Sequence, residues 1–260
     1  MKATASATSS PTWSAGAGCP RDLGRRYIMV NVPDFMLKFV ADNAVVHTTR
    51  VIVGQTDKQT PIFSDEMEHI VVNPYWNVPS SIAAKEMLPK IQNDPEYFQR
   101  HNYEIVQQVG RKVQVVDPAS IDWSSANAKN LPFRFRQPPG ARNALGNIKF
   151  MFPNQHSVYL HDTSSRGLFK RDYRALSHGC VRVDDPMSFA DVVLAEEPDW
   201  NAARLKKSIG GGERTIKLDH HIPVHITYFT TYVNEAGDLV IKNDLYGHNA
   251  RVKKALGLKS

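Results

Sequence analysis

Apolar and polar residues alternate in short runs along the first part of the chain, as is typical of strands with one exposed face. The pattern predicts strands at Tyr27–Val32, Phe35–Val40, Val45–Val53 and Glu68–Val72. Pro33-Asp34 and Asp42-Asn43 supply turn residues between the first three of these runs. The sequence therefore predicts that the fold begins as an antiparallel meander.

The pattern then changes, which predicts an insertion. A helix is expected over Ser81–Ile91, and residues 93–139 combine prolines with short patterned pieces, among them a hairpin that turns at Gly110. A connection this long in a compact domain is often functional. We expect residues 93–139 to form a capping or lid subdomain over an active site; the alternative is a packed excursion with no role in substrate selection.

The rest of the chain returns to strands with a few helices. Strands are expected at Ile148–Phe152, Ser157–His161, Val224–Val233 and Leu239–Lys242, and helices at Asp185–Leu194 and Asn201–Ile209. The predicted organisation is a leader over residues 1–24, disordered or the remnant of a longer parent, a mainly β domain over residues 25–250, and a C-terminal tail over residues 251–260.

Composition narrows the class of protein. The chain has 260 residues, 42% hydrophobic and 22% charged, which is ordinary for a soluble globular protein. The net charge of +6 suggests an anionic surrounding such as a cell-wall polymer or a membrane surface. Nucleic acid is not expected as a partner, because the basic residues are scattered and no nucleic-acid-binding motif is present. No run approaches the ~20 apolar residues of a transmembrane segment.

Cysteine and histidine usage gives no reason to expect a disulfide, a metal or a cofactor. Cys19 and Cys180 are too few and too far apart for a disulfide framework or a zinc site. His220-His221-x-x-x-His225 lacks a fourth ligand at a recognisable position. Cys19 lies in the leader and is expected to be a bystander.

Cys180 has the neighbours of a reactive thiol. A thiol attacks a carbonyl as thiolate, so it needs a base or a positive field nearby. His161 can supply the base, and Gly179 permits close approach of the backbone, whose N–H groups around Gly179 and Cys180 can hold an oxyanion. The structural alternatives are a buried cysteine that packs as a small apolar residue and a hydrogen-bonded core histidine.

These residues stand in a pattern that resembles a known family. His161, a gap, then Ser177-His178-Gly179-Cys180 and Arg182 resemble the signature of the L,D-transpeptidases, the YkuD-type catalytic domain. Val53-Gly54 and Thr60-Pro61-x-Phe63-Ser64 resemble the opening of the same domain. Asn73-Pro74-x-Trp76-x-Val78-Pro79 resembles the long-chain periplasmic branch, which carries a capping subdomain. The resemblance implies a β-sandwich-like catalytic fold.

The resemblance also implies roles for individual residues. Cys180 becomes the nucleophile, and His161 the general base, oriented by the backbone carbonyl of Asp162. Gly179, Ser177 and His178 become supporting members of the catalytic loop. Arg182, Tyr159, Trp76 and Asp162 are expected at the substrate-binding surface, where the planar guanidinium of Arg182 can meet a substrate carboxylate. Trp76 could instead be a core aromatic.

The implied activity is peptidoglycan 3→3 cross-linking through a Cys180 thioester, with release of terminal D-Ala. The implied partners are a donor tetrapeptide stem, an acceptor amine and carbapenem inhibitors, and the implied location is the periplasm or cell envelope. Alternatives are an L,D-carboxypeptidase, a transpeptidase that anchors lipoproteins, and a non-catalytic wall-binding module. From the sequence alone, carbapenem acylation of Cys180 is expected to accelerate as the pH rises through neutrality.

Overall fold

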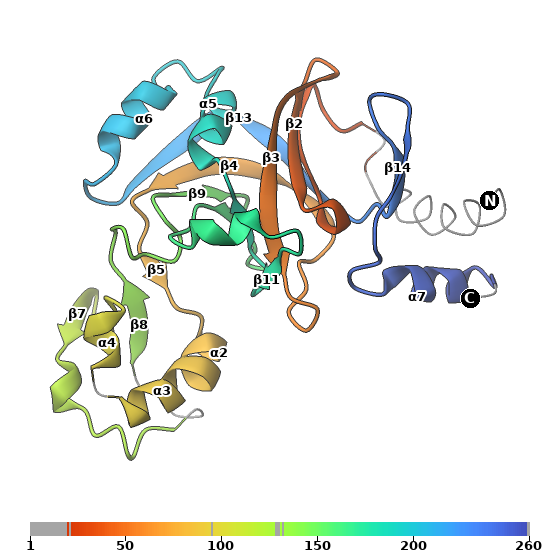
Figure 1. Ribbon diagram of the computed structural model, residues 1–260. Coiled ribbons are helices and arrows are strands. Elements are labelled where there is room, and N and C mark those ends of the chain that lie inside the picture. The colour runs from red at the N-terminus through yellow and green to blue at the C-terminus, as the bar shows by residue number, and fades with distance from the viewer. Residues whose placement is uncertain (1–19, 21, 95, 128–130, 132, 259–260) are drawn as a thin grey trace.

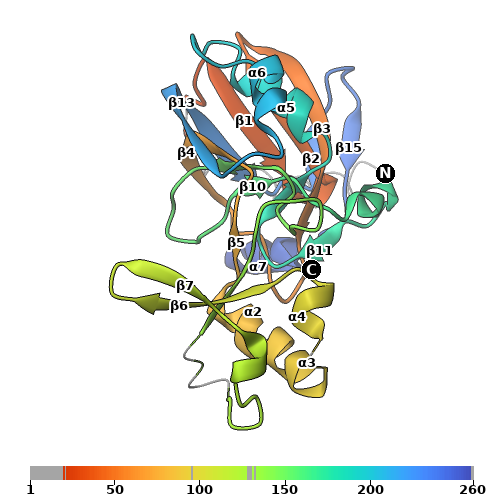
Figure 2. The ribbon, with the colours of Figure 1, turned by 90° about the vertical axis from the view of Figure 1, so that its left-hand side faces the viewer.

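The computed structural model describes residues 20, 22–94, 96–127, 131 and 133–258. Figure 1 shows a β-sheet domain with a smaller subdomain beneath it, and the turned view in Figure 2 shows the same separation. Cys19 and nearly all of the expected leader lie outside the described residues.

The main sheet has nine strands in the order β11-β3-β12-β10-β9-β4-β13-β1-β2. Its strands are β1 Arg26–Asn31, β2 Met36–Ala41, β3 Ala44–Gly54, β4 Phe63–Val72, β9 Ile148–Met151, β10 Leu160–His161, β11 Ala175–Ser177, β12 Val181–Val183 and β13 Arg214–Thr227. An additional pairing between β2 and β3 closes the sheet on itself. The prediction of a mainly β fold with few helices is confirmed, with this closure as a detail that the strand pattern could not supply.

The opening meander forms as predicted. In β1 the side chains alternate between buried and partly exposed, because successive residues of a strand face opposite sides. A 3-10 helix, Val32–Asp34, leads into β2. Asp42 and Asn43 both have positive φ, the conformation that a tight turn between β2 and β3 requires and that Asp and Asn tolerate.

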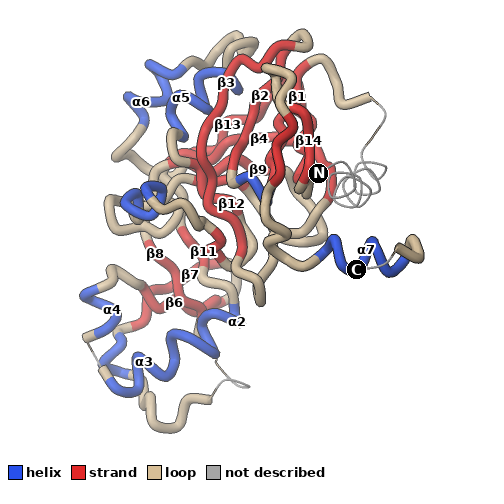
Figure 3. Tube along the Cα trace, turned by 45° about the vertical axis from the view of Figure 1, so that its right-hand side comes forward, coloured by secondary structure: helices blue, strands red, loops and turns tan. Residues whose placement is uncertain are grey.

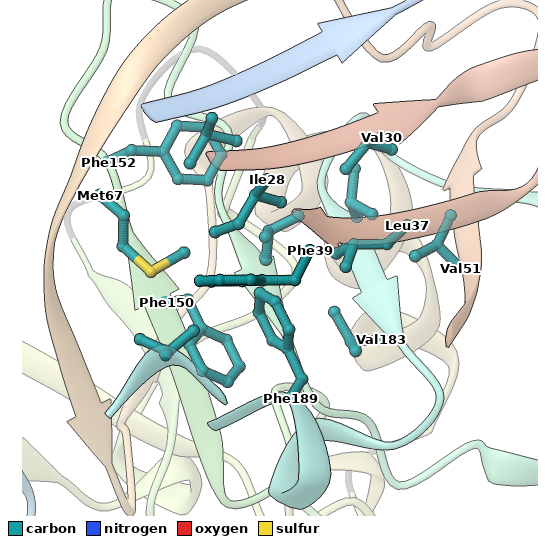
Figure 4. Close-up of a cluster of buried hydrophobic side chains, with 14 of the residues drawn as sticks. Ile28, Val30, Leu37, Phe39, Val51, Met67, Phe150, Phe152, Val183 and Phe189 are labelled. Carbon is teal, nitrogen blue, oxygen red and sulfur yellow. The ribbon is translucent and has the colours of Figure 1, made fainter. Parts of the chain in front are cut away.

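The core fills the interior of the closed sheet and extends to helices outside it. Figure 4 shows Phe39, Phe150 and Phe189 packed together. Phe189 belongs to α5, Pro186–Val193, and its ring centroid lies 4.7 Å from that of Phe150. The side chain of Asp185 accepts a hydrogen bond from Ser188 N at 3.1 Å and so caps α5. The neighbouring helix α6, Ala202–Ser208, is capped in the same way by Asn201. Figure 3 shows α5 and α6 side by side on the sheet domain.

The predicted final strand, Val224–Val233, was wrong in extent. The observed β13 begins ten residues earlier, at Arg214, and ends at Thr227; β14, Thr231–Val233, then pairs with β15, Leu239–Ile241. A register irregularity between Lys217 and Ile222 interrupts the regular alternation. Because the bulge breaks the alternation of buried and exposed residues, the sequence pattern does not show that the first half of β13 belongs to the same strand.

The smaller subdomain has a hydrophobic core of its own. Its four strands are β5 Trp76–Asn77, β6 Glu104–Val109, β7 Lys112–Val116 and β8 Arg134–Gln137. Its helical segments are α2 Ser80–Ile82, a π-helical turn Ala83–Met87, α3 Leu88–Asn93, α4 Tyr97–Arg100 and a 3-10 helix Pro118–Ser120. Its buried cluster comprises Val78, Ala83, Met87, Ile91, Phe98, Ile105 and Phe135.

The lid therefore begins earlier than the expected residue 93. Ala83, Met87 and Ile91 recur every fourth residue, so they share one side of the helical segment, and that side packs into the lid cluster. Below, "the lid" means residues 76–137. Removing only residues 93–139 would leave this apolar side uncovered.

Two further helices complete the described structure. A 3-10 helix spans Arg166–Lys170, and α7 spans His248–Ala255, where a frayed tail was expected over residues 251–260. No helix among the described residues is long and apolar enough to cross a membrane.

Because the two cores are separate, we expect matched truncations to act on different parts of the molecule. Phe150→Ala in the sheet core and Phe98→Ala in the lid core each remove a fully buried ring, at a cost of about 3–5 kcal/mol. Phe150→Ala should lower the global free energy of unfolding. Phe98→Ala should accelerate hydrogen exchange across the lid and leave the sheet amides protected. Equal loss of protection in the sheet would show that the lid is no separate unit.

Candidate active site

A cavity of about 1040 Å³ lies between the lid and the sheet domain. Most of the residues singled out from the sequence line it: Cys180, His161, Ser177, His178, Arg182, Tyr159 and Trp76. Gly179 and Asp162 are not among its lining residues. The fold thus brings together residues that are up to 106 positions apart, the separation of Trp76 and Arg182.

Parallel pairing of two short strands creates the centre of the site. In the register of β10 and β12, His161 lies beside Arg182, and Val181 N donates to Tyr159 O at 3.1 Å. Side chains two residues apart on a strand share a face. Tyr159 and His161 therefore project from the same side of the sheet as Cys180 and Arg182, into the cavity that all four line.

His161 is buried and held in one tautomer. Its Nδ1 lies 2.5 Å from the backbone oxygen of Asp162. Because a carbonyl oxygen only accepts, Nδ1 carries the proton, which leaves Nε2 as an unprotonated base. Burial lowers the pKa of His161 to about 3, assisted by the positive charges of Arg182 and Lys149 and opposed by the hydrogen bond to Asp162.

Cys180 is also held in its neutral form. Burial raises the pKa of its thiol above the usual value, while hydrogen bonds from the backbone and then the hydroxyl of Tyr159, and the charge of Arg182, act in the opposite direction. The Sγ atom lies 3.9 Å from Ser157 O. A neutral thiol and a neutral imidazole that line the same cavity favour proton transfer during attack over a preformed thiolate–imidazolium pair.

The side chain of Ser177 makes hydrogen bonds within the loop that carries Cys180. The Ser177 hydroxyl donates to Cys180 O at 2.5 Å and accepts from Gly179 N at 3.2 Å. Gly179 has φ +115°, a conformation that side-chain-bearing residues rarely adopt. The N–H of Gly179 is thus already used within the loop, which differs from the expectation that it faces an oxyanion.

Asp162 supports the histidine and does not face the cavity. Its carboxylate accepts hydrogen bonds from Asn147 N at 2.9 Å, from Thr163 N at 2.7 Å and from Arg166 Nη1 at 2.7 Å. A Cβ on Gly146 would come within 2.2 Å of this carboxylate, so there is no room for any side chain at residue 146. The carboxylate anchors the segment whose carbonyl orients His161.

Arg182 places a positive charge on the floor of the cavity. Its Nε is buried and has no hydrogen-bond partner among the described residues. The charge lies close enough to influence the pKa values of both Cys180 and His161. A guanidinium that lines a cavity is suited to an anionic group of a ligand.

The lid contributes residues that the sequence did not single out. Glu86 lies in the π-helical turn, and its Oε1 is 2.8 Å from His178 Nε2 and 2.7 Å from Lys58 Nζ. These contacts hold the pKa of Glu86 below its usual value, with the Lys58 hydrogen bond as the largest cause. Glu86 thus connects the lid to the residue two positions before Cys180. In the sequence Glu86 is a charged residue within a predicted helix, so no local pattern distinguishes it.

Aromatic residues of the lid form another part of the cavity wall. Trp76 is half-buried, and its ring centroid lies 6.1 Å from that of Tyr103. Tyr103 is stacked on Tyr97 with centroids 5.9 Å apart, and all three residues line the cavity. Trp76 therefore packs against the lid core and also faces the cavity.

Metal ligation is not suggested by the described residues, in which no three His, Cys, Asp or Glu side chains group as ligands would. The histidines at 221 and 225 have other partners. His225 contacts Ser64 Oγ at 2.8 Å and Leu23 O at 3.2 Å, and His221 lies 3.5 Å from Glu66.

Comparison with known proteins shows the family. Residues 25–236 match the YkuD family, described as the L,D-transpeptidase catalytic domain. The chain is 40% identical over 231 residues to a Haemophilus influenzae protein named "Putative L,D-transpeptidase". That alignment covers 88% of this chain and 45% of the relative, so the chain spans about half the relative's length.

Solved structures with the same description are also similar. An L,D-transpeptidase from Mycobacterium smegmatis is 13% identical with a TM-score of 0.35, over 78% of this chain and 58% of its own. A cysteine-to-serine mutant of the Enterococcus faecium L,D-transpeptidase is 10% identical with a TM-score of 0.35, over 78% of this chain and 50% of its own.

The depressed pKa of His161 makes stability depend on pH. The unfolded chain protonates His161 near its usual pKa of 6.5, whereas the folded state resists protonation down to about 3. The stability contributed by neutral His161 is complete above pH 6.5 and is lost as the pH falls toward 3. At pH 5 the loss is about 2 kcal/mol. His161→Gln should flatten this part of the curve of unfolding free energy against pH, measured by urea titration. An unchanged slope would show that His161 does not carry the effect.

Proposed function

This chain belongs to the YkuD family of L,D-transpeptidase catalytic domains, and on that premise we propose that it forms 3→3 cross-links in peptidoglycan through a thioester on Cys180. The observation that carries the proposal is the buried, neutral His161, fixed through Nδ1 and placed with Cys180 on one wall of a large cavity. The proposed location is the periplasm or cell envelope. The net charge of +6 suits an anionic wall polymer.

The first half-reaction acylates the enzyme. Sγ of Cys180 attacks the carbonyl at the L-centre of diaminopimelate in the donor stem, while Nε2 of His161 takes the thiol proton. The carbonyl oxygen becomes an oxyanion. When the C–N bond to D-Ala breaks, His161 returns the proton to the departing amine, and a thioester remains on Cys180.

The second half-reaction transfers the acyl group. An amine of another stem attacks the thioester carbonyl, and His161 again takes the proton as the C–N bond forms. The C–S bond then breaks, and Sγ recovers the proton from His161. One peptide bond is exchanged for another through the thioester, so the chemistry requires no external energy source.

The shape and charge of the cavity suit a branched, anionic peptide. Its volume of about 1040 Å³ is at the upper end of the usual range for small-ligand sites. Lys85 and Lys90 of the lid line it together with Lys58 and Arg182 of the sheet domain. We assign Arg182 to a stem carboxylate and Trp76, with Tyr159, to the walls of the groove.

Cys180→Ala should abolish both acylation and cross-linking, because it removes the nucleophile and little else. Mass analysis of the muropeptide products measures cross-linking, and the intact mass of the protein measures the thioester. Cys19→Ala is the matched control and should leave both unchanged. Cross-linking by the Cys180→Ala protein would end the mechanism. Hydrolysed stems in place of cross-links would assign water as the acceptor.

Carbapenem acylation tests the protonation state of the pair. We expect one adduct per chain, on Cys180, formed at a rate nearly constant between about pH 5 and 8 because His161 is already neutral there. The rate should rise only above the usual thiol pKa of 9.0. This revises the expectation from sequence of acceleration through neutrality. His161→Ala should slow the reaction on the order of 10²–10⁴-fold. A pH profile that steepens between 5 and 8 would indicate a preformed ion pair instead.

Glu86 is expected to hold the lid over the bound stem. Its contacts with Lys58 and His178 are partly exposed, so Glu86→Gln should cost about 1 kcal/mol, or a factor of about five. We expect a higher KM for muropeptides with kcat little changed. Glu96→Gln, on the exposed lid surface beside Arg100, is the control. Equal KM values for the two variants would remove Glu86 from this role.

A further inference from the structure

A buried hydroxyl lies behind the peptide that joins Gly179 to Cys180. Thr60 Oγ1 donates to Gly179 O at 2.8 Å and accepts from Gly54 N at 2.8 Å. The Thr60 side chain is 1% exposed. Since a backbone N–H can only donate, the single hydroxyl proton of Thr60 is directed to Gly179 O. The orientation of this hydrogen bond is therefore determined by its partners.

The bond determines where the next N–H points. A trans peptide is planar, and its N–H points opposite to its C=O; the described chain has no cis peptide. Because the carbonyl of Gly179 faces the buried Thr60, the N–H of Cys180 is directed away from Thr60. Gly179 N is bonded to Ser177, whereas no hydrogen bond is made by Cys180 N within the described structure. The N–H of the nucleophile itself is thus a loop amide left for an oxyanion.

Thr60 is in turn held by the C-terminal segment. The Tyr246 hydroxyl accepts from Thr60 N at 3.2 Å and donates to Gly54 O at 2.7 Å. Tyr246 N donates to the Tyr228 hydroxyl at 2.6 Å, and that hydroxyl donates to Asp244 Oδ1 at 2.7 Å. The Tyr228 and Tyr246 rings are stacked with centroids 5.6 Å apart. A chain of oriented donors therefore connects the C-terminal part of the sequence to the catalytic loop.

The turn that presents Thr60 is closed too tightly to shift. A Cβ on Gly54 would lie 2.1 Å from Lys58 O and 2.7 Å from Thr60 N, so only glycine fits there. The carbonyls of Lys58 and Gln59 also lie against Gly179, at 4.0 and 3.6 Å from the position a Cβ would take. Residues 54–60 thus form a rigid support beneath residues 179–180.

We propose that Thr60 is a positioning residue for acyl transfer: its hydroxyl holds the Gly179–Cys180 peptide with the Cys180 N–H aimed at the developing oxyanion, and Tyr246 holds Thr60. The inference rests on the proposed acyl chemistry of Cys180 but not on the identity of the stem peptide. Stabilisation of the oxyanion affects the transition state of attack on a carbonyl. It has no counterpart in attack on a disulfide, where no oxyanion forms.

Two small probes separate these reactions. With p-nitrophenyl acetate, a bond forms between Sγ and the carbonyl carbon, nitrophenolate leaves, and His161 takes the thiol proton. With dithiodipyridine, Sγ bonds to one sulfur and releases pyridinethione, without carbonyl chemistry. Thr60→Val removes the hydroxyl at nearly constant volume. It should slow ester acylation about ten- to hundredfold and leave disulfide exchange at Cys180 within about twofold of wild type.

Three variants complete the experiment. Thr60→Ser keeps the hydroxyl and should restore most of the ester rate. Tyr246→Phe should reduce that rate by a smaller factor, about three- to tenfold, and keeps the proposal testable if Thr60→Val fails to fold. Thr227→Val is the matched control, since Thr227 in β13 is equally buried and its hydroxyl donates to Val30 O in β1 at 3.1 Å. It should change neither reaction.

Equal slowing of both probes by Thr60→Val, or no slowing of either, would overturn the proposal. So would a Thr60→Ser protein as slow as Thr60→Val. If the ester reaction depends on Thr60 but muropeptides are not cross-linked, the positioning role stands and the proposed substrate fails. If the wild-type thiol reacts with the disulfide but not with the ester, both the acyl chemistry and this inference fail.

Discussion

The parallel pairing of β10 with β12 is the constraint on which the site depends. It aligns His161 with Arg182 and places Tyr159, His161, Cys180 and Arg182 on one face of the sheet. Parallel neighbours require a crossover, which residues 162–180 provide. A slip of one residue would turn two of the four side chains away from the cavity.

Burial then decides the electrostatics of the site. Removal from water favours the neutral forms of both His161 and Cys180, and the charge of Arg182 opposes protonation of the imidazole while it favours the thiolate. The result is an imidazole that is unprotonated at physiological pH and a thiol that is neutral there, both lining the same cavity. Hydrogen bonds to the backbone, from His161 to Asp162 and from Ser177 to Cys180, hold both groups without an acidic side chain in direct contact.

Two independent supports converge on the catalytic loop. From the lid, Glu86 reaches His178, so the position of the lid is linked to the residue two before Cys180. From the sheet domain, Thr60 reaches Gly179. The lid has its own hydrophobic core, whereas the turn at residues 54–60 is packed tightly within the sheet domain.

The sequence by itself determined the class of fold, the opening meander and a central group of the cavity-lining residues, among them Cys180, His161 and Arg182. Those features depend on local information: period-two alternation, turn residues such as Asp42 and Asn43, and a motif of residues at fixed spacing. Only the tertiary structure decided where the lid begins, that β13 starts at Arg214, and that Asp162 faces away from the cavity. The same holds for Thr60, Glu86 and Tyr246, whose partners lie 119, 92 and 186 residues away. Thr60 stands in a motif, but no motif or period names the partner of any of the three, because such pairs arise when distant strands fold together and bury polar groups that must then find hydrogen bonds.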